Sequence, residues 1–115
     1  MTEQPLIKVV ASLIFKKNIK TLGKKYRSIR NDIEPIIKKL QSGESPGDRI
    51  PEIGYRVFKL RIRNSDSQKG KSGSYRLIYY CQTATRVILL TIYSKSEQVN
   101  ITANDIKKII AQIES

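Results

Sequence analysis

The sequence predicts an α+β domain in which an N-terminal helical hairpin packs on a three- to four-stranded antiparallel sheet, followed by a C-terminal helix. Apolar residues recur at three- and four-residue intervals from Phe15 to Leu40, which is the spacing of amphipathic helices. Between residues 55 and 94 three strand-like segments follow one another through short links. Short links favour an antiparallel meander with the helices gathered on one face, and the length favours a single domain over residues 1–115.

The helical pattern divides into two expected helices, at about residues 10–22 and 25–42. Gly23 is the expected break between them, and Pro35 should kink the second helix or mark a later start. Thr102 and Asp105 resemble a capping box. They predict a final helix whose apolar face consists of Ile106, Ile109, Ile110 and Ile113.

The expected strands are Tyr55–Arg63, Ser74–Cys81 and Arg86–Ser94. The third is almost entirely apolar through Ile92, which predicts the central position in the sheet. Leu6–Val10 is either an edge strand or the lead into the first helix. The segments 43–54 and 64–74 are rich in Gly, Ser and charged residues, so both are expected to be loops.

The first of these strands separates two kinds of side chain. Phe58, Leu60 and Ile62 alternate onto one face, which should pack on the core. Lys59, Arg61 and Arg63 project together from the other face, about 7 Å apart. A solvated strand would normally mix charge signs, since like charges repel. The pattern therefore favours a phosphate-binding surface.

The formal net charge of +12 favours a polyanion or an acidic protein as the partner, although a merely soluble basic protein would share it. Part of this charge lies on the first helical segment, where Lys16, Lys20 and Lys24 occupy the polar face. These lysines are compatible equally with a solvated helix face and with contact to RNA or the ribosome.

Composition also narrows the chemistry. The chain has no histidine and one cysteine, Cys81, which disfavours thiolate catalysis, histidine triads and zinc sites. No glycine-rich loop opens a helix, so we expect no nucleotide cofactor. The acidic residues are scattered singly along the chain, so we expect no metal either. No apolar run approaches the roughly 20 residues of a membrane span, and residues 1–5 do not resemble a signal peptide. A cytoplasmic location is expected.

Lysine, arginine and tyrosine can cleave RNA without a metal, because the 2′-hydroxyl of RNA supplies the nucleophile. The protein need only remove its proton, stabilise charge on the phosphorus and help the 5′-oxygen leave. Lys59 can act as the base if neighbouring cations such as Arg61 and Arg63 lower its pKa. Arginine binds phosphate through its fork of donors.

Four segments, Val57–Arg63, Lys69–Gly73, Ser74–Tyr80 and Leu90–Gln98, together resemble the RelE/ParE toxin superfamily, and most closely its RelE branch of HigB type. The resemblance implies the toxin of a type II toxin–antitoxin pair. Such toxins are ribosome-dependent endoribonucleases that cut messenger RNA in the aminoacyl site. It also implies an antitoxin with an acidic segment and a toxin–antitoxin hetero-oligomer.

The resemblance assigns roles to particular residues. Lys59 and Arg61 fall on positions implicated in acid–base work and phosphate contact, and Arg76 on the arginine that stabilises the cleaved phosphate. Tyr93 and Lys95 fall where further catalytic or RNA-orienting residues lie. The expected RNA- or ribosome-binding residues are Arg63, Lys69, Lys71, Lys16, Lys20 and Lys24.

The sequence departs from the family at Ser74, where a second glycine is usual, and lacks the C-terminal tyrosine of some relatives. The identity of the base is therefore open, and Glu97 is expected to pair with Lys95 rather than to catalyse. Two other functions remain possible. A ParE-like toxin shares the fold and inhibits DNA gyrase without chemistry, and a basic RNA-binding module would only bind. The basic strand together with Arg76 favours the endonuclease.

Overall fold

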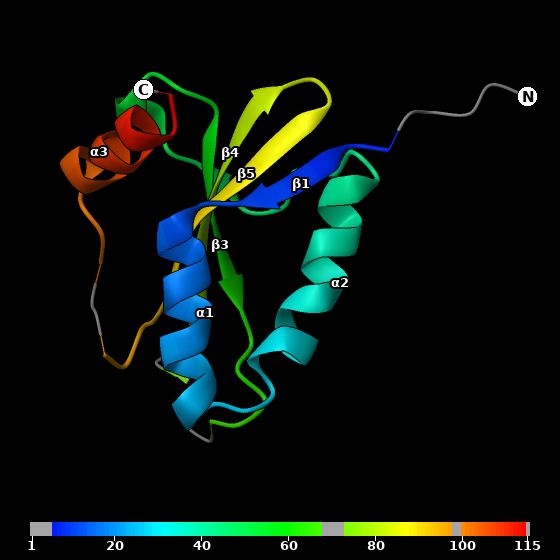
Figure 1. Ribbon diagram of the computed structural model, residues 1–115, viewed down its shortest axis with the longest axis vertical. Coiled ribbons are helices and arrows are strands. Elements are labelled where there is room, and N and C mark those ends of the chain that lie inside the picture. Colours follow the sequence, from blue (N-terminus) through cyan, green and yellow to red (C-terminus); the bar gives the residue numbers. More distant parts are fainter. Residues whose placement is uncertain (1–5, 68–72, 98–99, 115) are drawn as a thin grey trace, which may run out of the picture.

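The computed structural model of the protein describes residues 6–67, 73–97 and 100–114. A helical hairpin, a sheet and a C-terminal helix follow one another along the chain, which confirms the α+β class (Figure 1). The sheet, however, has five strands in the order β1-β5-β4-β3-β2, and β1 runs parallel to β5. The prediction of three or four strands, all antiparallel, is wrong because two short segments complete the edges of the sheet.

Both edge strands are too short to carry an alternation pattern of their own. The strands are β1 (Lys8–Ala11), β2 (Asp48–Arg49), β3 (Val57–Ile62), β4 (Tyr75–Thr83) and β5 (Arg86–Ser94). A 3-10 turn, η1 (Pro51–Ile53), follows β2, so the segment 43–54 is not wholly loop. The middle strand is β4, whereas β5 lies between β1 and β4. β5 was predicted to be central because its residues are apolar, but any strand with neighbours on both sides is equally buried.

The helical hairpin consists of α1 (Leu13–Lys25) and α2 (Ile29–Gln41). The Ser12 side chain caps α1 by accepting a hydrogen bond from the Phe15 amide, and the same hydroxyl donates to the Leu90 carbonyl of β5. The helix continues through Gly23 and ends only at Tyr26, whose backbone is extended. The predicted break at Gly23 is therefore wrong, since one glycine costs a helix only about 1 kcal/mol.

The second helix also starts later than predicted, at Ile29. The Ser28 amide just before it donates to the Asp66 carboxylate, at 2.7 Å, so a loop between strands satisfies an otherwise free donor. α2 then runs through Pro35 to Gln41. Pro35 therefore does not mark the start of this helix.

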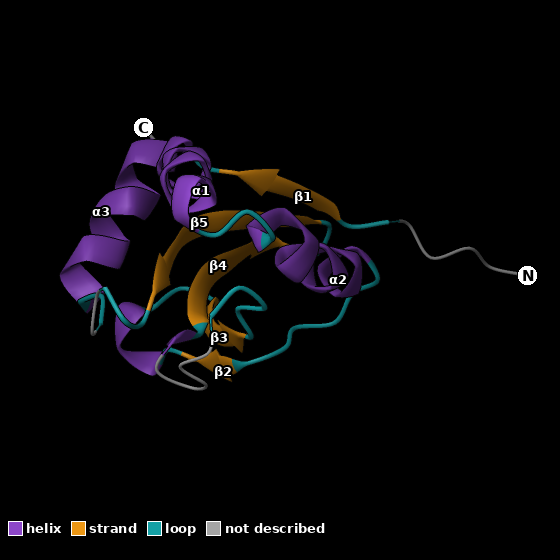
Figure 2. Cartoon of the chain, turned by 90° about the horizontal axis from the view of Figure 1, so that it is seen from below, coloured by secondary structure: helices purple, strands orange, loops and turns teal. Residues whose placement is uncertain are grey.

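The two faces of the sheet carry separate cores. Phe58, Leu60 and Ile62 of β3 contribute to the core under α1 and α2, as their alternation predicts. The opposite face packs against α3 (Ala103–Glu114), so the expectation that all helices share one face is wrong (Figure 2). The reason lies in β4 and β5, which present buried apolar residues in both directions.

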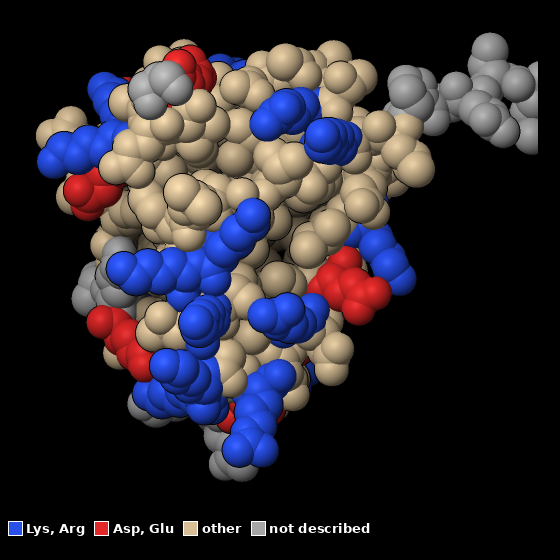
Figure 3. All heavy atoms as spheres, viewed as in Figure 1, with Lys and Arg blue, Asp and Glu red and all other residues tan. Residues whose placement is uncertain are grey.

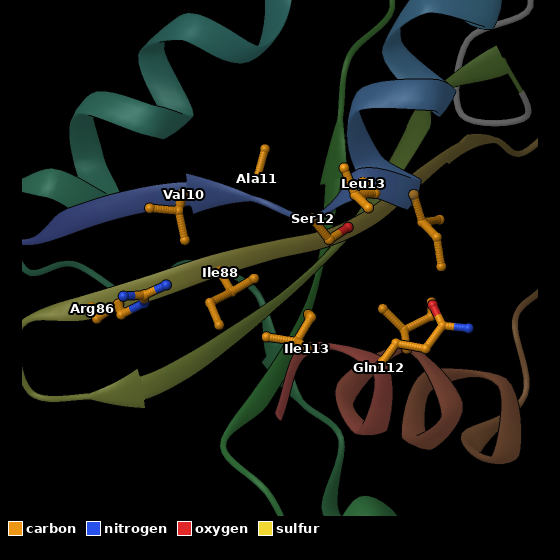
Figure 4. Close-up of a pocket in the computed structure, with 10 residues that line it drawn as sticks. Val10, Ala11, Ser12, Leu13, Arg86, Ile88, Gln112 and Ile113 are labelled. Atoms are coloured by element: carbon orange, nitrogen blue, oxygen red, sulfur yellow. The ribbon is translucent and has the colours of Figure 1, made fainter. Parts of the chain in front are cut away.

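The C-terminal helix begins as its capping box predicts, with the Asp105 amide donating to the Thr102 hydroxyl at 3.1 Å. Its apolar side buries Ile106, Ile109 and Ile110 against the sheet. Near its end α3 leaves a cleft against the start of α1, β1 and β5, lined by Ile88 and Ile113 among others (Figure 4). In the part of the chain that the structure describes, no helix is long and apolar enough to cross a membrane.

Candidate active site

The register of three strands places three of the expected site residues in one row. Arg61 on β3 lies directly opposite Arg76 on β4, and Arg76 lies opposite Tyr93 on β5. Neighbouring strands are about 4.8 Å apart, so side chains that share a face in such a row are in reach of one another. The sequence alone did not specify this pairing, because it depends on the register of two hairpins.

Two lysines extend this row. Lys59 lies two residues before Arg61 on the same face of β3, and its charge interacts with those of Lys95 and Arg76. Lys95 follows the end of β5, where its backbone amide donates to the Ser74 carbonyl at 2.9 Å. We refer to these residues as the strand-end cluster, which consists of Lys59, Arg61, Arg76, Tyr93 and Lys95.

The strand-end cluster lies on the α3 side of the sheet, beyond the part that α3 covers. Val57, Ile78 and Tyr80 on the same face are buried in the core beneath α3. Arg61, farther along β3, is exposed, and Lys59, Arg76 and Lys95 are each half-buried. The cations therefore have walls around them and an open side toward solvent.

The environment of Lys59 suits a proton carrier. Burial, followed by the nearby charges of Lys95 and Arg76, lowers the pKa of Lys59 below its ordinary value. All three causes disfavour the ammonium form, so a larger share of Lys59 is neutral near physiological pH than for a solvated lysine. Lysine can act as a base only in this neutral form.

Tyr93 is the most enclosed member of the cluster, with 5% of its surface exposed. Burial raises the pKa of its hydroxyl, against which Arg76 acts in the opposite direction. Tyr93 therefore stays protonated at neutral pH and can donate a hydrogen bond. Because its ring is packed in the core, it cannot stack on an RNA base without rearrangement.

Arg76 is held in place from its own strand. Its Nη1 donates to the Tyr75 carbonyl at 3.3 Å, which leaves other guanidinium donors able to face a ligand. Arg61, directly opposite, is exposed to solvent. Among the described residues, no hydrogen bond to the backbone holds its side chain in the same way. Two guanidinium forks on adjacent strands can hold one phosphate from two sides.

Asn100, which the sequence analysis did not single out, joins two members of the cluster. Its Oδ1 accepts hydrogen bonds from Lys59 Nζ at 2.9 Å and from the Tyr93 hydroxyl at 3.4 Å. Asn100 and Lys59 also line a hollow of about 260 Å³ together with Glu52 and Ile101. The sequence carried no signal for this contact beyond the position of Asn100 shortly before the helix cap at Thr102.

The backbone beside Lys59 is supported by a close approach of the preceding loop. Gly47 has a φ of +95°, and a Cβ at this position would run into the carbonyl oxygen of Lys59. The position therefore requires glycine for two reasons, its left-handed backbone and the lack of space. β2, which follows, then pairs with β3 at Asp48 opposite Lys59.

The expected RNA-binding residues are distributed over the surface. Arg63 is exposed one residue beyond β3, and Lys16, Lys20 and Lys24 are exposed on α1. Figure 3 shows Lys and Arg side chains gathered over α1, on the side of the molecule from which Figure 1 is drawn. These three lysines belong to a helix that packs on the other face of the sheet from the cluster. Lys69 and Lys71 lie outside the described residues.

Glu97 forms an ion pair with Lys25 of α1 at 3.0 Å, so it has a structural partner, although not the one named from the sequence. Among residues 6–67, 73–97 and 100–114, no three His, Cys, Asp or Glu side chains are grouped closely enough to hold a metal ion. The chemistry available in the cluster is thus that of amines, guanidinium groups and a phenol.

Comparison with known families finds a match. A family model described as the RelE toxin of the RelE/RelB toxin–antitoxin system matches residues 14–113. The match includes α1 apart from Leu13, α2, all strands except β1, and α3 apart from Glu114, and so contains every residue of the strand-end cluster.

Proposed function

The chain belongs to the RelE toxin family, the toxins of toxin–antitoxin systems, and from this premise we propose that it is a ribosome-dependent endoribonuclease that cleaves messenger RNA. The proposed reaction is metal-independent attack of a 2′-hydroxyl on the adjacent phosphate, in the aminoacyl site of the ribosome. Translation stops because the message is cut. The protein would act in the cytoplasm, where ribosomes work.

The observation that carries this proposal is the row of Arg61, Arg76 and Tyr93 with a partly buried lysine beside it. A surface evolved only for solubility has no use for cations placed opposite one another, since such pairs destabilise a sheet. A bound phosphate removes this repulsion. The row therefore fits a ligand whose charge is negative and whose position is well defined.

In the proposed reaction Lys59 is the base. Its neutral amine accepts the proton of the 2′-hydroxyl, and the 2′-oxygen forms a bond to phosphorus as the bond to the 5′-oxygen breaks. The products are a 2′,3′-cyclic phosphate and a 5′-hydroxyl. The lowered pKa of Lys59 supports this assignment, since a base works best when its pKa lies near the working pH.

The remaining members of the cluster act on charge and on the leaving group. Arg61 and Arg76 bind the non-bridging oxygens, whose negative charge increases in the transition state. The ammonium of Lys95 donates a proton to the departing 5′-oxygen. Tyr93 contributes its hydroxyl, which is protonated and close to Lys59 through Asn100.

The exposed cations outside the cluster suit the ribosome, which presents phosphate over a wide surface. We assign Arg63, Lys16, Lys20 and Lys24 to contacts with ribosomal RNA, together with Lys69 and Lys71. Such contacts contribute affinity that falls as salt rises. We assign the positioning of the message to the ribosome as well, since the cluster has an open side toward solvent.

A RelE toxin has a cognate antitoxin, and here we propose that its toxin-binding segment is acidic. A chain with a net charge of +12 associates fastest with a partner of opposite charge. The association rate with the antitoxin should therefore fall as ionic strength rises. A rate that does not change with salt would show that apolar burial alone drives the complex.

The decisive experiment compares the protein with two matched variants on translating ribosomes. Purified protein, Arg76→Ala and Arg27→Ala are each added to a reconstituted translation reaction, and the new 5′ ends on the message are mapped. Arg27 is an exposed arginine between α1 and α2, so its removal changes charge without touching the cluster. We expect cuts in phase with codons for the parent and Arg27→Ala, and almost none for Arg76→Ala.

Two controls separate the alternatives. The same message without ribosomes tests whether free RNA is cut, and a DNA gyrase supercoiling assay tests the ParE-like function. Intact messages on ribosomes, combined with inhibited gyrase, would reject the endonuclease in favour of a gyrase inhibitor. Intact messages with neither activity would leave a basic binding protein.

A further inference from the structure

We propose that Asn100 is a positioning residue that holds Lys59 in the strand-end cluster through a neutral hydrogen-bond acceptor. This inference rests on the proposed function, because it assigns Asn100 a purpose in the reaction of Lys59. It adds a residue that lies outside the sheet, in the segment leading into α3. The argument depends on the contacts of one atom, Asn100 Oδ1.

Three donors from different parts of the chain converge on this oxygen. Lys59 Nζ of β3 donates to it at 2.9 Å, the Tyr93 hydroxyl of β5 at 3.4 Å and the backbone amide of Ile101 at 2.9 Å. The convergence of donors identifies the atom as the amide oxygen rather than the nitrogen. Because the Ile101 amide is part of the backbone, it orients the Asn100 side chain independently of the cluster.

Lys59 needs such an anchor. Its flexible stem would carry the charged end away from the like charges of Lys95 and Arg76 and into solvent. The charged groups that face it come from several elements. They are Arg61 on β3, Arg76 on β4, Lys95 after β5 and Asp48 on β2. Arg49 and Glu52 line the hollow that Lys59 shares.

An amide oxygen holds the amine without restoring its charge. A carboxylate at the same distance would favour the ammonium form and so remove the neutral amine that the reaction requires. With asparagine, the neutral amine of Lys59 donates one N–H to Oδ1 and keeps its lone pair for the proton of the 2′-hydroxyl. After the transfer, the ammonium still donates to the same oxygen, so the anchor is kept through the step.

The test uses a substitution that keeps the shape of the side chain and changes only its charge. In Asn100→Asp the hydrogen-bond acceptor remains, whereas in Asn100→Ala it is lost. Asn31→Asp is the matched control, since it adds the same charge at an exposed position on α2, away from the cluster. Thermal melts first establish that all variants are folded.

The first measurement needs no RNA. The titration of the Lys59 side chain is followed by nuclear magnetic resonance in the free protein. Asn100→Asp should move its midpoint to higher pH, and Asn31→Asp should leave it in place. An unchanged midpoint in Asn100→Asp would overturn the proposal, because a carboxylate within hydrogen-bond distance cannot leave an amine unaffected.

The second measurement is the pH dependence of single-turnover cleavage on ribosomes. Asn100→Asp should lose roughly tenfold in rate near neutral pH for each unit by which the pKa of Lys59 rises, and should recover as the pH is raised. Asn100→Ala should lose rate at every pH without recovery, since it removes the anchor itself. A merely structural role would lower both rates without displacing the profile, and that result would reject the proposal.

The two measurements also separate this inference from the proposed function. If the parent protein cuts no message while the midpoint of Lys59 moves in Asn100→Asp, the endonuclease is wrong and the contact between Asn100 and Lys59 stands. If the parent cuts and the profile of Asn100→Asp coincides with that of the parent, the endonuclease stands and the role of Asn100 is rejected.

Discussion

One face of the sheet has two ends with opposite properties. At the end covered by α3, Ile78, Ile88 and Leu90 are fully buried or nearly so and pack on the apolar side of the helix. At the other end, only two residues along β4 from Ile78, Arg76 stands opposite Arg61. The same strands therefore carry the interior of the protein at one end and an open group of cations at the other.

The difference shows which features of this face serve stability and which serve a ligand. Burial of apolar side chains under α3 stabilises the fold, whereas like charges opposite one another on a sheet destabilise it. A protein tolerates like charges opposite one another where its function depends on them. Substitutions at the two ends should therefore have separable effects, on stability at the covered end and on activity at the cluster.

The largest effect is expected at the covered end. Ile88, opposite Tyr80 on β4, is almost completely buried, so Ile88→Ala should lower the free energy of unfolding by about 2–5 kcal/mol, and Ile88→Val by about 0.5–1.5 kcal/mol. Thermal and urea unfolding measure the loss. Cleavage by the remaining folded protein should stay close to that of the parent. An unchanged melting temperature in Ile88→Ala would mean that this end is not packed as described.

At the strand-end cluster, we expect substitutions to lower activity strongly and to change stability little. Arg76→Ala should lower the cleavage rate about a hundredfold, which corresponds to about 3 kcal/mol for one well-aimed donor. Its unfolding free energy should stay within about 0.5 kcal/mol of the parent, as for most surface changes. Arg76→Lys should also be inactive, because a point charge cannot replace the guanidinium fork. Growth on induction and a thermal melt are the two measurements.

A folded, well expressed Arg76→Ala protein that is as toxic as the parent would show that the row on the three strands only binds. The two ends would then differ only in their exposure to solvent. Binding of the antitoxin provides the control, since it should be nearly unchanged in this variant.

A smaller effect is expected in the pH dependence of stability, and it arises at the covered end. Burial, with a hydrogen bond to Glu114, raises the pKa of the Tyr80 hydroxyl at the covered end to about 12. The unfolded chain loses this proton near pH 10, so the folded protein binds more protons between about pH 10 and 12 and its stability falls as the pH rises through this range. Tyr80→Phe should show a shallower decline there in urea unfolding measured at successive pH values. Equal slopes in both proteins would contradict the assignment.

The smallest expected effect is a gain in stability. Arg61→Thr removes one cation of the Arg61–Arg76 pair and introduces a residue that favours strands, so it should stabilise the fold by about 0.2–1 kcal/mol while lowering activity. Arg63→Thr is the control, since Arg63 lies beyond the last paired residue of β3. Differential scanning calorimetry should resolve the difference. A loss of stability in Arg61→Thr alone would show that the pair is not repulsive.

The two ends also differ in how much of them the sequence predicts. The alternation of β3 assigned Lys59 and Arg61 to one face and Phe58, Leu60 and Ile62 to the other, and both assignments are confirmed. Period-two alternation is a property of the strand itself, so it needs no knowledge of neighbours. The final helix and its cap at Thr102 were predictable for the same local reason.

Features that depend on distant parts of the chain were not predictable. The row of Arg61, Arg76 and Tyr93 depends on strand register, which shifts between Ile78 and Tyr79 where β4 meets β5. The position of α3 could not be predicted because both faces of the sheet are apolar, and each could be covered by a helix. Asn100 joins the site only through its contacts with Lys59 of β3 and Tyr93 of β5, and a polar residue in a loop has no periodicity that would reveal them.

The parallel pairing of β1 with β5 has a consequence for the time at which the protein forms. The Ser12 hydroxyl that caps α1 donates to Leu90, 78 positions later, so the first strand and the first helix lack their partner until β5 has been synthesised. Contacts over such separations require the closure of long loops and make folding slow compared with that of helical domains. The strand-end cluster likewise draws on β3, β4, β5 and Asn100. A nascent chain can therefore assemble the cluster only when its last helix is about to be made. The site is incomplete during most of the synthesis of the chain.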